Sequence, residues 1–151
     1  MLERLIREDP DVEADDSSKS YVRFAPREWD KSAALRSGSG WTGSGRLLLF
    51  EFHYRGNDLR LKLTIGLGPQ PTRQLLLDTA LAHRPPFTVT NRNLHQKWDM
   101  IYDRQMVKDA LSLEMSIDDV EAQLRQRWAD FVAGDLQAIT SALKAQRDLW
   151  Q

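Results

Sequence analysis

Residues 37–68 read SGSGWTGSGRLLLFEFHYRGNDLRLKLTIGLG, and this stretch decides the fold. Two segments in which apolar and polar residues alternate meet at Gly56 and Asn57, which is the pattern of a β-hairpin with a two-residue loop. In that register one face of the hairpin is apolar, with Tyr54 facing Leu59, Phe52 facing Leu61, Phe50 facing Leu63 and Leu48 facing Ile65.

The other face of the predicted hairpin is polar. Its facing pairs are Arg55 with Asp58, Glu51 with Lys62, and His53 with Arg60. Two of these three pairs have opposite charge, and such pairs stabilise a sheet by roughly 0.2–1 kcal/mol each. A loop of glycine and serine residues around Trp41 leads directly into the first strand.

The hairpin belongs to a longer series of motifs. These are SSKSYVRFAPREWD at residues 17–30, ALRSGSGWTGSGRLLLFEFH at residues 34–53, PPFTVTNR at residues 85–92, and a tryptophan-containing C-terminal helix. Over residues 17–148 the chain resembles the region downstream of the nuclease domain in certain bacterial PD-(D/E)XK nuclease superfamily proteins. The catalytic motif of such proteins lies upstream, so the resemblance implies a non-catalytic accessory domain and brings no catalytic residues with it.

Length and composition limit the kind of protein. A chain of 151 residues with 41% hydrophobic content is long enough for one core and too short for two. It contains no cysteine, which excludes disulfides and thiolate metal sites. No apolar run reaches the roughly 18 residues of a membrane span, and the first ten residues lack the pattern of a signal peptide. We therefore expect a soluble cytoplasmic protein with no membrane partner and no cofactor.

The acidic stretch DPDVEADDSSKS at residues 9–20 has the composition of a linker. We therefore divide the chain into an N-terminal helix and linker at residues 1–16 and one domain at residues 17–151. Because the linker has few apolar side chains, we expect the fold to lose little stability when residues 1–16 are removed.

The remaining periodicities predict an α+β fold. We expect a mainly antiparallel sheet of about four or five strands, packed against one mid-chain helix and the C-terminal helices. Besides the hairpin, strands are predicted at residues 21–24, 87–90 and 98–106. A helical turn is predicted at residues 26–29 and a helix at residues 72–83. Ser116 and Asp119 resemble a capping box that opens the C-terminal helices.

No residue pattern identifies a catalytic reaction. A PD-(D/E)XK site needs two carboxylates for a divalent metal and a nearby lysine, whereas the hairpin offers only Glu51, His53 and Lys62. Glu51 and Lys62 are already explained as a cross-strand pair. His53, His83 and His95 are not spaced as zinc ligands, so we assign no catalytic residue and no metal ligand. We expect the chain alone to cut neither DNA nor RNA.

The net charge is −1, but residues 46–115 contain ten basic and seven acidic side chains. We expect nucleic acid to bind there weakly and with salt dependence, through the glycine loop and the polar face of the hairpin. The candidate nucleic-acid-binding residues are Arg36, Trp41, Arg46, Arg55, Arg60 and Lys62. Trp29 and Trp41 lie in predicted loops and are candidates for stacking, whereas Trp98 and Trp128 are expected in the core.

Three functions follow from these patterns. The first is an accessory domain of a PD-(D/E)XK nuclease-type protein that positions nucleic acid or mediates assembly, with nucleic acid or an upstream nuclease domain as its partner. The second is a free-standing protein-interaction module, such as a homodimer. The third and least favoured is a small divergent metal-dependent nuclease.

Overall fold

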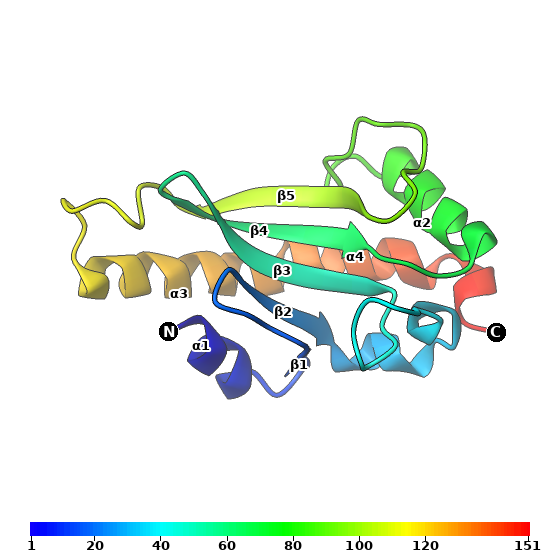
Figure 1. The fold of residues 1–151 in the computed structure, drawn as a ribbon, viewed down its shortest axis with the longest axis horizontal. Helices are drawn as coiled ribbons and strands as arrows, with labels where there is room; N and C mark the ends of the chain where they lie inside the picture. The colour runs from blue at the N-terminus through cyan, green and yellow to red at the C-terminus, as the bar shows by residue number, and fades with distance from the viewer.

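A computed structural model describes residues 1–151 as an α+β fold with one five-stranded antiparallel sheet (Figure 1). The strands are β1 (Val12–Ala14), β2 (Tyr21–Pro26), β3 (Leu48–Arg55), β4 (Asp58–Ile65) and β5 (Asp99–Val107). They lie side by side in chain order, so every strand pairs with its neighbour in sequence. The predicted fold class is therefore confirmed.

The β3–β4 hairpin has the predicted register. Arg55 pairs with Asp58 at the turn, and the pairing continues without a shift to Leu48 and Ile65. Gly56 has a positive φ of 60°, a conformation that glycine adopts without the steric cost of a side chain. The tight turn thus depends on glycine at position 56, which adopts this positive φ readily.

Helices pack on one side of the sheet. The α-helices are α1 (Leu2–Glu8), α2 (Gln70–Ala82), α3 (Ile117–Ala133) and α4 (Asp135–Lys144), and the 3₁₀ turns are η1 (Arg27–Lys31), η2 (Ala34–Arg36) and η3 (Arg147–Leu149). Helices α3 and α4 run along one face of the sheet, while α2 lies at the end where β4 finishes (Figure 1). The Ser116 hydroxyl accepts a hydrogen bond from the Asp119 backbone N–H, as the capping pattern predicts.

The core between α3 and the sheet is aromatic. Phe24 and Phe50 stack with ring centroids 5.2 Å apart, and Trp128 meets Phe24 edge-on at 5.2 Å. Trp29 also belongs to this core, because it is only 2% exposed and donates its indole N–H to the Thr140 hydroxyl. The prediction that Trp29 is available for stacking was therefore wrong. No helix in the structure is both long enough and apolar enough to cross a membrane.

Two predicted elements differ in detail. Helix α2 begins at Gln70 instead of residue 72, because Pro71 is tolerated in a first turn whose N–H groups have no helical partner. Residues 87–90 do not form a strand. Thr88 donates its N–H to the Ile101 carbonyl, but the Thr88 hydroxyl takes the place of a backbone acceptor for the Asp103 N–H, so no ladder develops.

The predicted linker is part of the sheet. Val12 is 2% exposed and pairs with Pro26, so β1 forms an edge strand within the acidic stretch. Leu5 and Ile6 of α1 are buried in the same core as β2. The interpretation of residues 9–20 as a solvated linker is corrected accordingly, because remote partners bind its acidic side chains.

We now expect removal of residues 1–16 to destabilise the protein strongly, since it removes buried apolar side chains together with β1. A point variant makes the test sharper: Ile6→Ala should lower the free energy of unfolding by about 2–5 kcal/mol, because it leaves a cavity under α1. Urea denaturation would measure the loss. The exposed neighbour Arg7→Ala is the control and should change stability little; equal stability of both variants would contradict the packing of α1.

Candidate functional site

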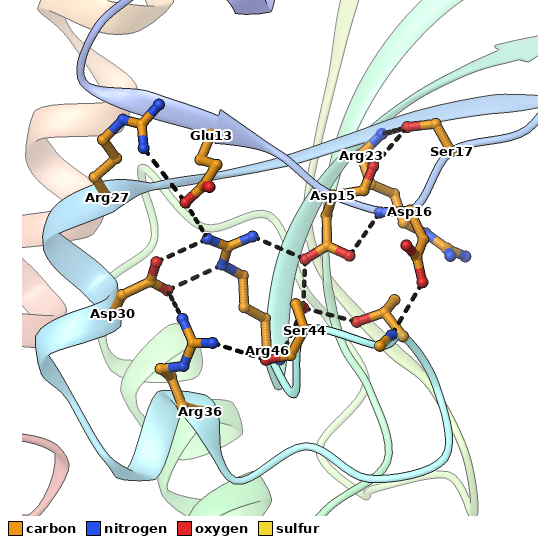
Figure 2. Close-up of polar contacts among 12 residues, drawn as sticks. Glu13, Asp15, Asp16, Ser17, Arg23, Arg27, Asp30, Arg36, Ser44 and Arg46 are labelled. Atoms are coloured by element: carbon orange, nitrogen blue, oxygen red, sulfur yellow. Dashed lines mark hydrogen bonds and ion pairs between the residues drawn. The ribbon is translucent and has the colours of Figure 1, made fainter.

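The most concentrated group of charges surrounds Arg46, the first residue after the glycine loop (Figure 2). Its Nε and Nη2 atoms donate to the two carboxylate oxygens of Asp30 at 2.9 and 2.7 Å. Its Nη1 lies 3.0 Å from Asp15 Oδ2, and its Nη2 also lies 2.7 Å from Glu13 Oε2. Arg46 is only 5% exposed, and each nitrogen of its guanidinium donates to at least one of these three carboxylates. We call Glu13, Asp15, Asp30, Arg36 and Arg46 the arginine cluster.

The arginine cluster keeps its acids charged. Burial alone would raise the pKa of Asp15, but hydrogen bonds from Ser44, the Asp16 N–H and Arg46 outweigh it and lower that pKa. The hydrogen bond from Arg46 is the main reason why the pKa of Asp30 is also lowered. The same bond raises the pKa of Arg46, so the cluster remains a set of ion pairs. A phosphate approaching Arg46 would meet these carboxylates first.

The glycine loop at residues 37–45 is held by the protein itself. The Gly38 N–H donates to the Gly45 carbonyl at 2.9 Å, and the Gly43 N–H donates to Asp16 Oδ2 at 3.0 Å. Trp41 lies directly on Gly66, where an added Cβ would come within 1.9 Å of the indole ring. These bonds use the N–H groups of Gly38 and Gly43 that a phosphate cradle would need, and Gly66 gives Trp41 room to pack.

The face of the sheet opposite α3 and α4 is the polar face, which carries Arg23, Glu51, His53, Arg60, Lys62 and Asp103. Glu51 binds two cations, since Arg23 Nε lies 2.8 Å and Lys62 Nζ lies 3.3 Å from its carboxylate oxygens. Arg60 Nε lies 3.0 Å from Asp103 Oδ1. The Glu51–Lys62 pair is confirmed. Because Arg23, Lys62 and Arg60 are all paired with carboxylates, little unpaired positive charge remains on this face.

The six predicted nucleic-acid-binding residues therefore do not form one surface. Arg36 and Trp41 lie with Arg46 at the glycine-loop end, where Arg36 is paired with Asp30 at 3.0 Å. Arg55 is exposed at the hairpin turn, at the other end of β3. The guanidinium of Arg46 is 5% exposed and bound by three acids, which argues against a phosphate contact at this residue. No three His, Cys, Asp or Glu side chains are arranged to hold a metal ion.

His53 has an unmet hydrogen-bonding group on the polar face, as does Thr64. The Nε2 atom of His53 is buried without a partner. Burial is the main cause that lowers the pKa of His53, and the positive charge of Lys62 adds to it, while Asp103 and Glu51 act in the opposite direction. The imidazole is therefore held neutral.

This arrangement predicts a pH dependence. Because the folded pKa of His53 lies below the unfolded value of about 6.5, the unfolded chain takes up a proton first as the pH falls, and stability decreases below neutral pH. His53→Gln removes this titration. Urea denaturation between pH 7.5 and 5 should show the variant gaining stability relative to the wild type as the pH falls; parallel curves would contradict the prediction.

Trp98 lies outside the core, contrary to the prediction, and Met100 is exposed beside it. They are 48% and 47% exposed, whereas Tyr102 is buried. The pairing of β4 with β5 shifts between Leu63 and Thr64, so that Leu63 pairs with Tyr102 and Thr64 pairs with Met100. A β-bulge of this kind moves the residues before it to the opposite face. The sequence shows no signal for the bulge.

A second group of exposed apolar side chains lies at the hairpin turn. Leu111, Leu113 and Ile117 follow β5, and Tyr54 precedes the turn. The Leu111 N–H donates to the Asn57 carbonyl at 3.1 Å, which fixes this loop against the hairpin. We call Met1, Tyr54, Leu111, Leu113 and Ile117 the hairpin-end surface.

Comparisons with protein-family models, with curated proteins and with solved structures found no match. The function is therefore argued from the surfaces of this chain.

The arginine cluster gives a stability prediction. Arg46→Met leaves three carboxylates around an apolar side chain, and loss of one partner of a buried ion pair costs about 3–5 kcal/mol. The melting temperature should fall by about 10 °C. Arg46→Lys keeps the charge without the planar fork and should lie between wild type and Arg46→Met. Arg127→Met, at an exposed position on α3, is the matched control. If both Met variants lose equally little stability, the prediction is contradicted, because solvent then screens the charges of the arginine cluster.

Proposed function

We propose that this chain is a non-catalytic accessory domain of a PD-(D/E)XK nuclease-type protein, and that it mediates assembly by self-association through the hairpin-end surface. The resemblance of residues 17–148 supports the accessory role. The observation that carries the assembly role is the position of the exposed apolar side chains: five of the seven large ones belong to the hairpin-end surface. Leu113 is fully exposed and Ile117 is 80% exposed, although both are aliphatic.

The hairpin-end surface has a concave part and a projecting part. Met1, Leu2 and Tyr54 line a groove of about 290 Å³ beside Val22. The loop at residues 108–116 extends beyond the end of the sheet next to the β3–β4 turn (Figure 1). Clustered exposed apolar side chains of this kind mark protein interaction sites in soluble proteins.

The charges around this surface favour a second copy of the chain as the occupant. Glu114, Asp118 and Asp119 lie on the side of α3, while Arg55 and Lys108 lie on the side of the hairpin turn, and all five are exposed. A twofold axis brings the same surface of two copies together. The acidic residues of one copy can then pair with Arg55 and Lys108 of the other, beside which Asp58 and Asp109 also lie, while the apolar residues pack between them.

Nucleic-acid binding at the predicted patch is the weaker account. Arg46, Arg60 and Lys62 were the main candidates for phosphate contacts, and each is paired with a carboxylate. A nuclease reaction is weaker still, because Glu51 already binds Arg23 and Lys62.

Self-association is tested by sedimentation velocity of the purified chain between 1 and 100 μM. We expect a concentration-dependent dimer. Leu113→Lys with Ile117→Lys should raise the dissociation constant at least about tenfold, because both side chains lose apolar contact area at the interface. Met100→Lys is the matched control, since Met100 is exposed elsewhere. A wild-type monomer at 100 μM, or a dimer that the double variant leaves unchanged, would refute the proposal.

A further inference from the structure

Trp98 and Met100 form an exposed apolar pair at the end of the polar face away from the hairpin turn. They line a pocket of about 270 Å³ together with Thr88, Asn91 and His95. Lys97 Nζ lies 5.7 Å from the Trp98 ring centroid. The sides of this pocket therefore offer an aromatic ring, an amide, a hydroxyl and an imidazole, and Lys97 lies beside the Trp98 ring.

Buried contacts hold the backbone of this surface in place. Arg73 of α2 donates to Asp99 Oδ2 at 3.0 Å, and both side chains are at most 5% exposed. Arg73 also donates to the carbonyls of His95 and Lys97 at 3.1 and 3.0 Å. The chain on both sides of Trp98 is thus fixed from within while its ring faces solvent, so a ligand would meet a preorganised surface.

The charge of this segment differs from that of the polar face. Residues 83–98 contain Arg84, Arg92 and Lys97 and no acidic residue. Arg92 and Lys97 are exposed and belong to none of the ion pairs of the structure, unlike Arg60 and Lys62. Asp99, the nearest acid along the chain, lines the pocket but is 5% exposed, and its carboxylate is bound by Arg73 and lies 2.6 Å from His95 Nδ1. Positive charge is therefore available here.

A second partly exposed tryptophan lies close by. Ile65 pairs with Asp99, and the same register carried one residue further places Gly66 beside Trp98. Trp41 packs on Gly66, and its ring centroid lies 5.0 Å from the Arg23 guanidinium. Trp41 therefore packs on the residue that follows β4, and Trp98 precedes β5 at the same end of the sheet.

We propose that this surface, comprising Asn91, Arg92, His95, Lys97, Trp98 and Met100, binds single-stranded nucleic acid. Trp98 stacks on an unpaired base, and Arg92 and Lys97 contact the flanking phosphates. Stacking requires a base whose face is free, which a duplex interior does not offer. This activity goes beyond the assembly function, because it uses the opposite end of the sheet.

Fluorescence anisotropy with labelled dT20 and rU20, at 50 mM salt and up to 100 μM protein, tests the stacking. Trp98→Ala should weaken binding about 5- to 150-fold, the range found for single stacked bases, and Trp98→Phe should retain most of the affinity. Gln123→Ala changes an exposed side chain on α3, outside both proposed surfaces, and should bind as the wild type does. Circular dichroism checks that each variant is folded.

The phosphate contacts have a separate readout. Arg92→Ala with Lys97→Ala should reduce the dependence of log affinity on log salt by about 1.4, since each phosphate on a single strand contributes about 0.7. Arg7→Ala with Arg127→Ala changes the net charge equally at exposed positions elsewhere and should leave the slope nearly unchanged.

Three results would overturn the proposal. The first is no binding of either oligonucleotide at 100 μM protein. The second is equal affinity of wild type and a folded Trp98→Ala variant. The third is equal affinity for a duplex of the same length, which would show that phosphates alone are recognised.

Discussion

The ion pairs of Arg46 are the constraint on which the N-terminal half of the structure depends. One guanidinium gathers carboxylates from β1, from the turn after it and from η1, although these segments lie 16 to 33 residues away in sequence. Removing a charge from water is costly, and the cost is offset only when every hydrogen bond of the group is met. Arg46 therefore fixes the edge strand, η1 and the glycine loop relative to β3 together.

This network explains which parts of the structure the sequence could predict. The hairpin follows from local alternation and a tight turn, and the start of α3 follows from Ser116, so both were predictable from neighbouring residues. Glu13 and Asp15 have the composition of a solvated linker because their partner is remote. Trp98 was predicted to lie in the core, but a bulge in β5 breaks the period of two and leaves the indole exposed. The ion pairs of the candidate site residues could not be predicted for the same reason: basic residues can be counted from sequence, but their pairing cannot.

The pairing of charges on the polar face directs attention to the two ends of the sheet. Arg23, Lys62 and Arg60 are balanced by Glu51 and Asp103, so the middle of this face has little attraction for an ionic ligand. The apolar hairpin-end surface lies at one end, and Trp98, which directly precedes β5, lies with its unpaired cations at the other. Strand β3 has eight residues, which separates the two ends by about 25 Å.

That separation determines how the two proposed activities relate. Groups this far apart with no shared partners contribute independently to stability and binding, so no conformational coupling between the ends is required. A twofold dimer through the hairpin ends directs its two Trp98 surfaces outward, on the order of 50 Å apart. Only a strand long enough to reach both would gain from the second contact, through effective concentration and not through a change in either site. Assembly would then select long single strands over short ones without any new recognition chemistry.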